Sequence, residues 1–334
     1  MSLDEKYINQ FAKITSKAAI STIPYLGKKD KKAADKAAVD NMRSELNKID
    51  MKGKIVIGEG ELDKAPMLYI GEKLGSGKGP DLDIAVDPLE GTNFAANNLP
   101  GALSVIAVSK VNNLFHAPET YMDKIAINTN QKGIVDIDFD TEKNIKNLAE
   151  FLNKDINQLT ACILDRPRHK KIIDKLKELK VKIKLISDGD VSGALLVSNK
   201  KYKVDIFLGI GGGPEGVLAA AALDSLGCYF QGKFLFDTEE SINRAKTMGI
   251  TDISKKYEIK DIIKGDSIFC ATGITSGDLV NGVKIKGNKY ITETLITHKS
   301  SNLNKILLQE DTIKTWLRYL YTIKDRSLVP SSIG

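Results

Sequence analysis

Apolar residues recur every three or four positions along the first fifty residues of the chain. This spacing predicts helices over residues 4–23 and 29–49. Apolar and polar positions then alternate over residues 54–58, 82–87 and 103–110, which is typical of strands. We therefore expect the amino-terminal part to be a helix pair followed by a sheet.

In the second half of the chain, short apolar runs alternate with amphipathic stretches. The runs predict strands over residues 160–164, 182–187, 204–210 and 267–272. The stretches between them predict helices over residues 168–179, 191–198 and 215–226. Strands that alternate with helices are typical of an α/β layer.

The last part of the chain is predicted to hold a hairpin and a closing helix. Residues 282–297 have the pattern of two short strands that turn at Gly287-Asn288. An amphipathic helix is expected over residues 304–321, from the spacing of Leu307, Leu308, Trp316 and Leu317.

No repeat and no low-complexity linker interrupts the chain, so any domain boundary is compact. We place it at residue 165. On this prediction an α+β domain covers residues 1–165 and an α/β domain covers residues 166–303. A carboxy-terminal helix over residues 304–325 would pack back on the first domain.

Composition is that of an ordinary globular protein. The 334 residues are 42% hydrophobic and 28% charged, which is enough apolar content for a sizeable core. The longest apolar runs, such as residues 217–223, are far shorter than the roughly 20 residues of a membrane span. The net charge of +6 comes mainly from lysines on predicted helices without interleaved aromatic residues. Neither a membrane nor a nucleic acid is an expected partner.

The cysteines indicate a reducing environment. Cys162, Cys228 and Cys270 are odd in number, widely spaced and embedded in apolar sequence. This pattern argues against a disulfide framework and favours buried, inert thiols. We expect a cytoplasmic location.

The segment DPLEGT, which begins at Asp87, is the first candidate for chemistry. Apolar positions alternate over residues 82–86 and deliver Asp87 to the end of a strand. Pro88 has no N–H group, so the ladder is expected to stop there. The carboxylate of Asp87 would then stand at a strand terminus.

The rest of this segment adds further polar groups. Glu90 follows Asp87 closely enough for both to hold one cation, Gly91 lets the backbone approach a phosphate, and Thr92 adds a hydroxyl. A plain β-turn with an acidic helix cap is the alternative interpretation. The functional interpretation gains weight because Glu59 and Glu61, separated by Gly60, follow another predicted strand in the same way.

A third candidate is Glu215, in the glycine-rich loop of residues 209–216 between a strand and an alanine-rich helix. Gly211, Gly213 and Gly216 satisfy the G-x-G-x-x-G pattern of dinucleotide-binding proteins. However, a carboxylate inside that loop would repel a pyrophosphate. We therefore favour a metal or substrate loop over a dinucleotide loop, and a plain tight turn stays open as a further alternative.

So many carboxylates cannot all be anionic and unpaired in one cleft, so either their pKa values rise or metal ions neutralise them, and metal ions are the more economical explanation. The expected ligands are all oxygen atoms, which favours Mg²⁺ or Mn²⁺ over zinc. His116, His169 and His298 are too scattered in sequence to form a site, and a surface or packing role is typical of each. For His169, which stands beside Arg168, a place near the substrate is the alternative.

Five segments in order resemble class II fructose-1,6-bisphosphatase, within the wider lithium-sensitive sugar-phosphatase group. They lie between residues 58 and 218 and read GEGELDKAPMLYIGE, DIAVDPLEGTN, LDRPRH, ISDGDV and GIGGGPEGV. The wider group usually has Asp where Glu90 stands, and this departure supports the narrower class. The resemblance implies an α/β fold, specifically an αβαβα five-layer sandwich. It also implies a metal-dependent cytoplasmic hydrolase of gluconeogenesis that forms a homo-oligomer, either a dimer or a tetramer.

The resemblance also implies roles for particular residues. Metal ligands are implied at Asp35, Glu59, Asp87, Glu90 and Glu215. Without the resemblance, Asp35 has the pattern of a solvated helix acid. Substrate contacts are implied at Glu90, Gly91, Thr92, Tyr121, Arg166, Pro167, Arg168, Asp188, Gly189, Asp190 and Gly212.

The residues themselves agree with most of these substrate roles. Arg166 and Arg168, stiffened by Pro167, suit a phosphate that is not cleaved, although such a pair also occurs in exposed loops. Asp188 and Asp190 follow a predicted strand and could accept hydrogen bonds from sugar hydroxyls or cap the next helix. Tyr121 offers a phenol, and a half-buried core tyrosine is its alternative role.

The resulting hypothesis is in-line attack of water on the 1-phosphate of fructose 1,6-bisphosphate, assisted by Mn²⁺ or Mg²⁺. The products are fructose 6-phosphate and inorganic phosphate. Glu61 is predicted to orient or deprotonate the water, and Thr92 to bond the transferring phosphate or help protonate the leaving oxygen. The alternatives are a phosphatase for sedoheptulose 1,7-bisphosphate or inositol phosphates, and a non-catalytic nucleotide-binding protein.

Overall fold

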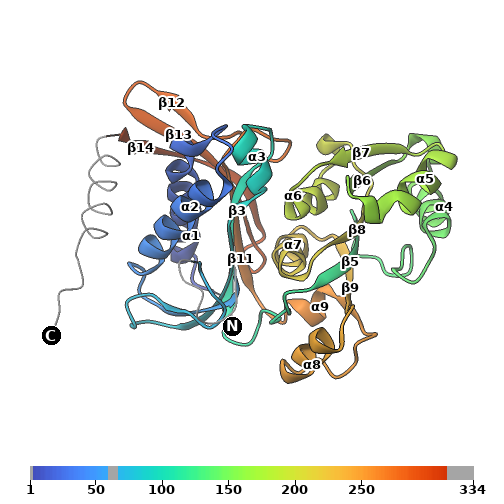
Figure 1. The fold of residues 1–334 in the computed structure, drawn as a ribbon, viewed down its shortest axis with the longest axis horizontal. Helices are drawn as coiled ribbons and strands as arrows, with labels where there is room; N and C mark the ends of the chain where they lie inside the picture. The colour runs from blue at the N-terminus through green and yellow to red at the C-terminus, as the bar shows by residue number, and fades with distance from the viewer. Residues whose placement is uncertain (1–2, 59–66, 314–334) are drawn as a thin grey trace.

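The computed structural model describes residues 3–58 and 67–313, which form two β-sheets flanked by helices (Figure 1). The first sheet has the order β12-β13-β11-β4-β3-β1-β2, and β14 pairs with β13. Its strands are β1 (Lys52–Ile57), β2 (Lys73–Leu74), β3 (Asp81–Glu90), β4 (Leu103–Lys110), β11 (Ser267–Gly273), β12 (Lys284–Lys286), β13 (Lys289–His298) and β14 (Leu303–Thr312).

The second sheet has the order β10-β9-β5-β8-β6-β7. Its strands are β5 (Tyr121–Ile127), β6 (Thr160–Leu164), β7 (Lys182–Ile186), β8 (Ile206–Gly212), β9 (Tyr229–Leu235) and β10 (Lys256–Glu258). β5 is antiparallel to both of its neighbours, β8 and β9, whereas β6 is parallel to β7 and β8. The carboxyl ends of β6, β7 and β8 therefore lie at one edge of the sheet.

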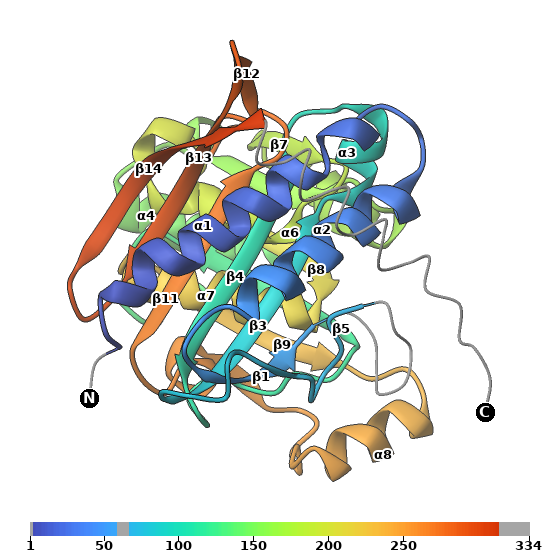
Figure 2. The same ribbon diagram turned by 90° about the vertical axis from the view of Figure 1, so that its left-hand side faces the viewer.

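The helices form layers outside and between the two sheets. In Figures 1 and 2, α1 (Lys6–Ser21) and α2 (Lys31–Leu46) cover the outer face of the first sheet. The central layer contains α6 (Asp190–Leu195) and α7 (Gly213–Ser225), and α4 (Thr141–Leu152) and α5 (Lys170–Glu178) lie beyond the second sheet. The shorter helices are α3 (Thr92–Asn97), α8 (Glu239–Thr247) and α9 (Ile259–Ile262). This arrangement confirms the predicted αβαβα sandwich.

The central helix α7 shows why the layers stack in this order. Its residues 217–223 are apolar and all buried, so the helix has no polar face to present to solvent. It packs against β3, β4 and β11 of the first sheet and against β5, β8 and β9 of the second. An alanine-rich helix is thin enough to let two sheets approach from opposite sides.

The two sheets do not follow one another simply along the chain. The chain passes from the first sheet to the second between β4 and β5, and it returns between β10 and β11. Sheet membership alone does not show which segments fold as independent units, so the domain boundary at residue 165 stays a prediction.

Most of the predicted elements are confirmed. The helix pair, the strands of both halves and the helices between them lie within a few residues of their predicted bounds. The hairpin turns as expected, because Lys286 pairs with Lys289 across Gly287-Asn288. Sequence patterns did not predict β5, β9, α4 or α8.

The closing helix predicted over residues 304–321 is wrong for its first part. Leu303–Thr312 forms β14, which pairs with β13 over ten consecutive positions, from Lys289 with Thr312 to His298 with Leu303. The spacing of the leucines predicted a helix here. The backbone N–H and C=O groups instead form hydrogen bonds with β13 along the whole ladder. Residues 314–321 of the predicted helix lie outside the described residues.

No helix in the described part of the chain has the length and apolar character needed to cross a membrane.

Candidate active site

The segment DPLEGT lies where β3 leaves the first sheet. The prediction that the strand stops at Asp87 is wrong. The strand continues through Pro88 to Glu90, with a shift in its register against β4. The missing N–H of Pro88 is tolerated because β1 pairs with β3 only as far as Ala85. Gly91 then adopts a left-handed conformation, with φ of 79°, and α3 begins at Thr92.

Glu90 is a buried carboxyl group with a strongly raised pKa. Its side chain is buried, and Oε1 accepts a hydrogen bond of 2.8 Å from the backbone N–H of Val191. Burial, together with the nearby charges of Glu215 and Asp190, raises the pKa of Glu90 to about 7, although a hydrogen bond with Asp87 opposes the shift. Glu90 of the first sheet therefore meets Asp190 of α6 and Glu215 of α7, which belong to the central layer.

Glu215 reaches this cluster from the first turn of α7. Burial is the main cause that raises the pKa of Glu215, and the charge of Asp190 adds to it. A Cβ atom at Gly211 would lie 2.0 Å from Asp190 Oδ2, and one at Gly212 would lie 1.8 Å from Glu215 Oε2. The glycines of this loop therefore make room for carboxylates. This occupancy argues against the dinucleotide interpretation of the loop.

Lys124 was missed by the sequence analysis. It lies on β5 with only 1% of its side chain exposed, forms an ion pair with Asp190, and donates a hydrogen bond of 2.6 Å to the Gly212 carbonyl. A lysine at an inward position between Met122 and Ala126 was the available signal, because buried lysines are rare unless they are paired. Lys124 supplies one positive charge to a group of acids.

The arginines stand at the carboxyl ends of the strands of the second sheet. Arg166 Nη1 donates a hydrogen bond of 2.6 Å to the Ser187 carbonyl, and Nη2 lies 3.6 Å from Asp188 Oδ1. Asp188 in turn accepts a hydrogen bond of 3.2 Å from the backbone N–H of Asn93 on α3. These contacts link β6 and β7 to the segment that follows DPLEGT.

Arg168 and Tyr121 form a second contact at the same edge. The guanidinium carbon of Arg168 lies 4.8 Å from the centre of the Tyr121 ring, within the range of a cation–π interaction. Arg168 also donates to the Ile210 carbonyl through Nε and Nη2. Both side chains are exposed, with Tyr121 at 53%, so an anion can reach them.

Other predicted site residues are less fully placed. Asp35 is half-buried on α2, whose Ala34 and Ala38 pack in the same apolar cluster as Leu89 of β3. Glu59 and Glu61 lie outside the described residues. Within residues 3–58 and 67–313, no group of three or more acidic, histidine or cysteine side chains is arranged to hold a metal ion.

The cysteines and histidines are as the sequence predicted. The thiols of Cys162, Cys228 and Cys270 are all free and buried. His169 and His298 are buried at different sheets, and His169 bonds only to backbone atoms. These residues form no joint site in the described part of the chain.

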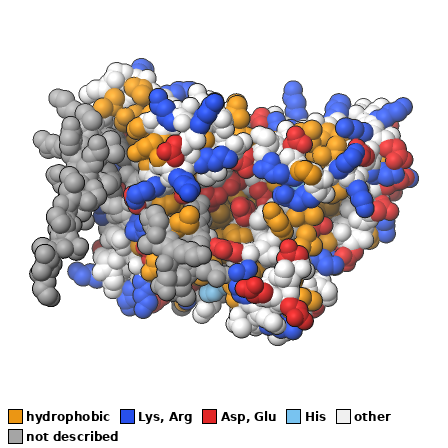
Figure 3. Space-filling model, viewed as in Figure 1, with side chains coloured by type: hydrophobic (Ala, Val, Ile, Leu, Met, Phe, Trp, Pro, Cys, Tyr) orange, Lys and Arg blue, Asp and Glu red, His pale blue; other side chains and the backbone are white. Residues whose placement is uncertain are grey.

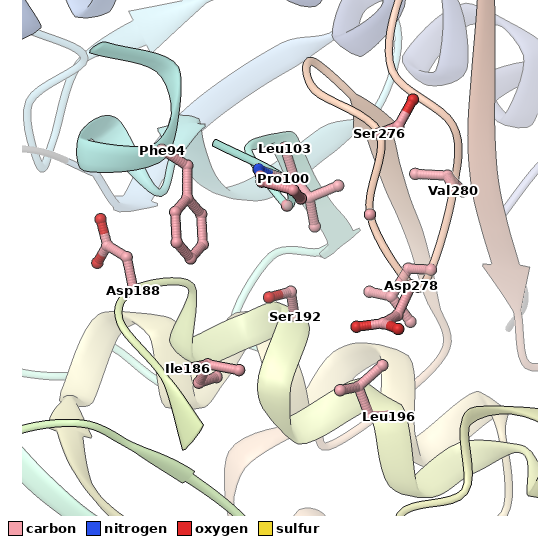
Figure 4. Close-up of a pocket in the computed structure, with 13 residues that line it drawn as sticks. Phe94, Pro100, Leu103, Ile186, Asp188, Ser192, Leu196, Ser276, Asp278 and Val280 are labelled. Atoms are coloured by element: carbon pink, nitrogen blue, oxygen red, sulfur yellow. The ribbon is translucent and has the colours of Figure 1, made fainter. Parts of the chain in front are cut away.

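A cavity of about 320 Å³ opens beside Asp188, between the two halves of the molecule. Figure 4 shows Phe94 and Asp188 toward one side of it and Asp278 and Val280 toward the other. In the space-filling view, acidic side chains gather in the hollow between the halves (Figure 3). Of the predicted site residues in the described part of the chain, Asp188 lines this cavity, whereas Glu90, Asp190 and Glu215 lie outside its lining.

Comparison with known proteins gives a consistent set of matches. Residues 5–310 match the family model described as "Bacterial fructose-1,6-bisphosphatase, glpX-encoded". A Synechococcus sp. (strain JA-2-3B'a(2-13)) protein is 41% identical over 324 residues, which cover 90% of this chain and 93% of the relative. It is named D-fructose 1,6-bisphosphatase class 2/sedoheptulose 1,7-bisphosphatase.

Two further relatives are similar to a comparable degree. The Fructose-1,6-bisphosphatase class 2 of Haemophilus influenzae is 42% identical over 312 residues, covering 89% of this chain and 93% of its own. A Prochlorococcus marinus (strain MIT 9515) protein with the same double name as the Synechococcus relative is 43% identical over 308 residues, covering 88% and 92%.

Proposed function

Because this chain belongs to the family of bacterial, glpX-encoded fructose-1,6-bisphosphatases, we propose that it hydrolyses the 1-phosphate of fructose 1,6-bisphosphate. The products are fructose 6-phosphate and inorganic phosphate. The chain is a class II fructose-1,6-bisphosphatase, which is a phosphoric monoester hydrolase of gluconeogenesis.

The observation that carries this mechanism is the meeting of buried carboxylates at Glu90. Glu90, Asp190 and Glu215 come from both halves of the molecule, and burial raises the pKa values of Glu90 and Glu215. Oδ1 of Asp190 is buried and has no hydrogen-bond partner among the described residues. The described carboxylates alone do not form a metal site, but together with Glu59, which lies outside the described residues, they would supply oxygen-only donors that suit Mn²⁺ or Mg²⁺.

The residues that would hold the cations are Asp35, Glu59, Asp87, Glu90 and Glu215. When bound, a divalent cation would lower the pKa of the attacking water and offset the charge on the phosphoryl oxygens. We assign Glu61 to orienting or deprotonating this water. Lys124 is placed to hold Asp190 and the Gly212 carbonyl in position on the side of the second sheet.

The phosphate that is cleaved is assigned to the residues that follow β3. Thr92 is half-buried at the first position of α3, directly after the left-handed Gly91. From there its hydroxyl can donate to the transferring phosphate or to the leaving oxygen. This contact would strengthen as negative charge builds on those atoms in the transition state.

The rest of the substrate is assigned to the second sheet. Arg166, Pro167 and Arg168, with Tyr121, would bind the phosphate that is not cleaved. Asp188, Gly189, Asp190 and Gly212 would bind the sugar. A planar guanidinium suits a phosphate because it offers parallel N–H donors, which supports this division of the site.

The test is phosphate release from fructose 1,6-bisphosphate with Mg²⁺ and Mn²⁺ titrated separately. We expect turnover that depends on the cation and that EDTA abolishes. Sedoheptulose 1,7-bisphosphate is a second candidate substrate, because two of the relatives carry that name, and inositol 1-phosphate serves as a comparison. No phosphate release from any of the three, combined with tight binding of NAD or ATP, would refute the proposal.

We also propose a cytoplasmic location and a homo-oligomer, either a dimer or a tetramer. The three free, buried thiols support a reducing compartment. Exposed apolar side chains at one edge of the first sheet support self-association, namely Ile285, Ile306 and Leu308.

A further inference from the structure

β6 and β8 are neighbours in the second sheet, but they separate before they reach the site. They pair only at Ala161 with Ile206 and at Cys162 with Phe207. β8 continues to Gly212, and β5 pairs with it along its other side. The edge of β8 that faces β6 therefore loses its strand partner at Ile210, where buried backbone groups need other partners.

The imidazole of His169 takes the place of this missing strand. Its Nδ1 lies 2.7 Å from the carbonyl oxygen of Leu164, the last residue of β6. Its Nε2 accepts a hydrogen bond of 2.7 Å from the N–H of Ile210 on β8. The side chain is 0% exposed. One neutral ring, protonated on Nδ1, thus joins the separated ends of two strands.

Gly209 shows that the backbone is shaped around this ring. Its φ is +132°, a conformation that side chains rarely adopt, and a Cβ atom there would lie 3.0 Å from His169 Nε2. The strand can bend toward His169 only because residue 209 is glycine. The ring and the glycine therefore fit one another across 40 residues of sequence.

Arg168 is hydrogen-bonded to Ile210, the residue of β8 that His169 also contacts. Its Nε and Nη2 donate hydrogen bonds of 3.0 Å and 2.8 Å to the Ile210 carbonyl. His169 holds the N–H of Ile210 and Arg168 holds its carbonyl, so the position of the ring determines where the guanidinium sits. The Nη1 donors of Arg168 take no part in this contact and can serve a ligand.

We propose that His169 is a positioning residue for the phosphate that is not cleaved, acting through Ile210 to place Arg168 beside Tyr121. The inference rests on the proposed function, which assigns Arg168 and Tyr121 to that phosphate. His169 itself touches no substrate, because it is enclosed between the two strands.

The test compares His169→Phe with His298→Phe. His298 is a matched control, since it is 1% exposed and both of its ring nitrogens are hydrogen-bonded, to Ser301 and Asp266, but it lies on β13 of the first sheet. Fructose 6-phosphate is the probe, because it carries only the phosphate that is not cleaved. Its Kd is measured by calorimetry on protein that circular dichroism shows to be folded.

We expect His169→Phe to weaken fructose 6-phosphate binding about tenfold or more, as expected for a misplaced charge-assisted hydrogen bond. KM for fructose 1,6-bisphosphate should rise more than kcat falls. His169→Gln should recover part of the affinity, because its amide can both donate and accept. His298→Phe should bind fructose 6-phosphate like the unsubstituted chain.

Equal affinity of folded His169→Phe and His298→Phe for fructose 6-phosphate would overturn the inference, and turnover by the unsubstituted chain would still support the proposed function. A chain that neither binds fructose 6-phosphate nor releases phosphate overturns both. If His169→Phe does not fold, Gly209→Ala replaces it, because the added methyl group would lie 3.0 Å from the ring and strain the backbone at φ of +132°, so that the contact between the ring and β8 has to shift. The same loss of affinity is expected, and unchanged affinity overturns the inference.

Discussion

At the scale of single residues, the site depends on side chains whose backbone positions are set by their glycine neighbours. Gly91 turns the chain so that Thr92 begins α3, and Gly211 and Gly212 leave room for the carboxylates of Asp190 and Glu215. A larger residue at position 211 or 212 would displace a carboxylate even without backbone strain. Small residues at these positions therefore serve the acids beside them.

Thr92→Ala is expected to lower kcat by about 100-fold or more and to change KM much less, because the lost hydroxyl acts mainly in the transition state. Thr92→Ser keeps the hydroxyl and should retain most of kcat. Steady-state kinetics on fructose 1,6-bisphosphate with saturating Mn²⁺ measure both values. Full kcat in the alanine variant would show that the hydroxyl of Thr92 takes no part in the reaction.

At the scale of elements, one carboxylate ties together segments that are far apart in the chain. Asp266, directly before β11, accepts hydrogen bonds from the N–H of Leu3 and from Ser300, and it also bonds to His298 of β13. Burial opposes ionisation of Asp266, but these hydrogen bonds outweigh it, so its pKa is lowered. The start of the described chain is thereby joined to the first sheet.

Asp266→Asn should reduce the free energy of unfolding by about 2 kcal/mol near pH 7, since hydrogen bonds to a charged group are lost. A carboxyl with a lowered pKa stabilises the fold above its ordinary value of about 3.9, and this contribution disappears as pH falls through the folded value. Urea unfolding at several pH values measures the difference. The gap between the two proteins should narrow below about pH 4, and a gap that is constant from pH 7 to pH 3 would contradict this account.

At the scale of the whole molecule, the site joins the first sheet to the central layer of helices. Glu90 belongs to the first sheet, and Glu215 begins the helix between the two sheets. The charges of the two carboxylates repel each other in the folded protein. A cation that binds both should therefore stabilise the folded protein. This consequence concerns stability and is independent of turnover.

Mn²⁺ at about 100 times its Kd should add about 2.7 kcal/mol of stability, because it binds the folded state. The melting temperature should rise by several degrees, and EDTA should reverse the rise. Glu215→Gln should show a smaller rise than the unsubstituted chain in the same calorimetric scan. An equal rise in both proteins would remove Glu215 from the ligand set.

The proposed assembly can be tested at the exposed edge of the first sheet. Ile306 and Leu308 point to the same side of β14 and are 42% and 64% exposed. Leu308→Glu should shift the protein to a smaller species in light scattering, because a charge would be buried at the contact. Leu185→Glu on β7, an exposed residue of the second sheet, is the control and should leave the assembly unchanged. An unchanged mass in Leu308→Glu would place the contact elsewhere.

The sequence by itself determined the elements whose pattern is local. The helix pair, the strands before each acidic segment and the turn at Gly287-Asn288 follow from residue spacing and turn chemistry. The candidate acids Asp87, Glu90 and Glu215 were also identified from their positions after strands. Local patterns suffice there because neighbouring residues in the chain make the contacts that decide these structures.

Only the tertiary structure decided the features that depend on distant partners. β14 is a strand because β13 lies beside it. Lys124 can be buried because it forms an ion pair with Asp190 and donates a hydrogen bond to the Gly212 carbonyl. β3 continues past Pro88 because β1 no longer pairs with it beyond Ala85. The cost of an unpaired backbone or charged group depends on what surrounds it, and the surroundings of these residues come from segments far away in the sequence.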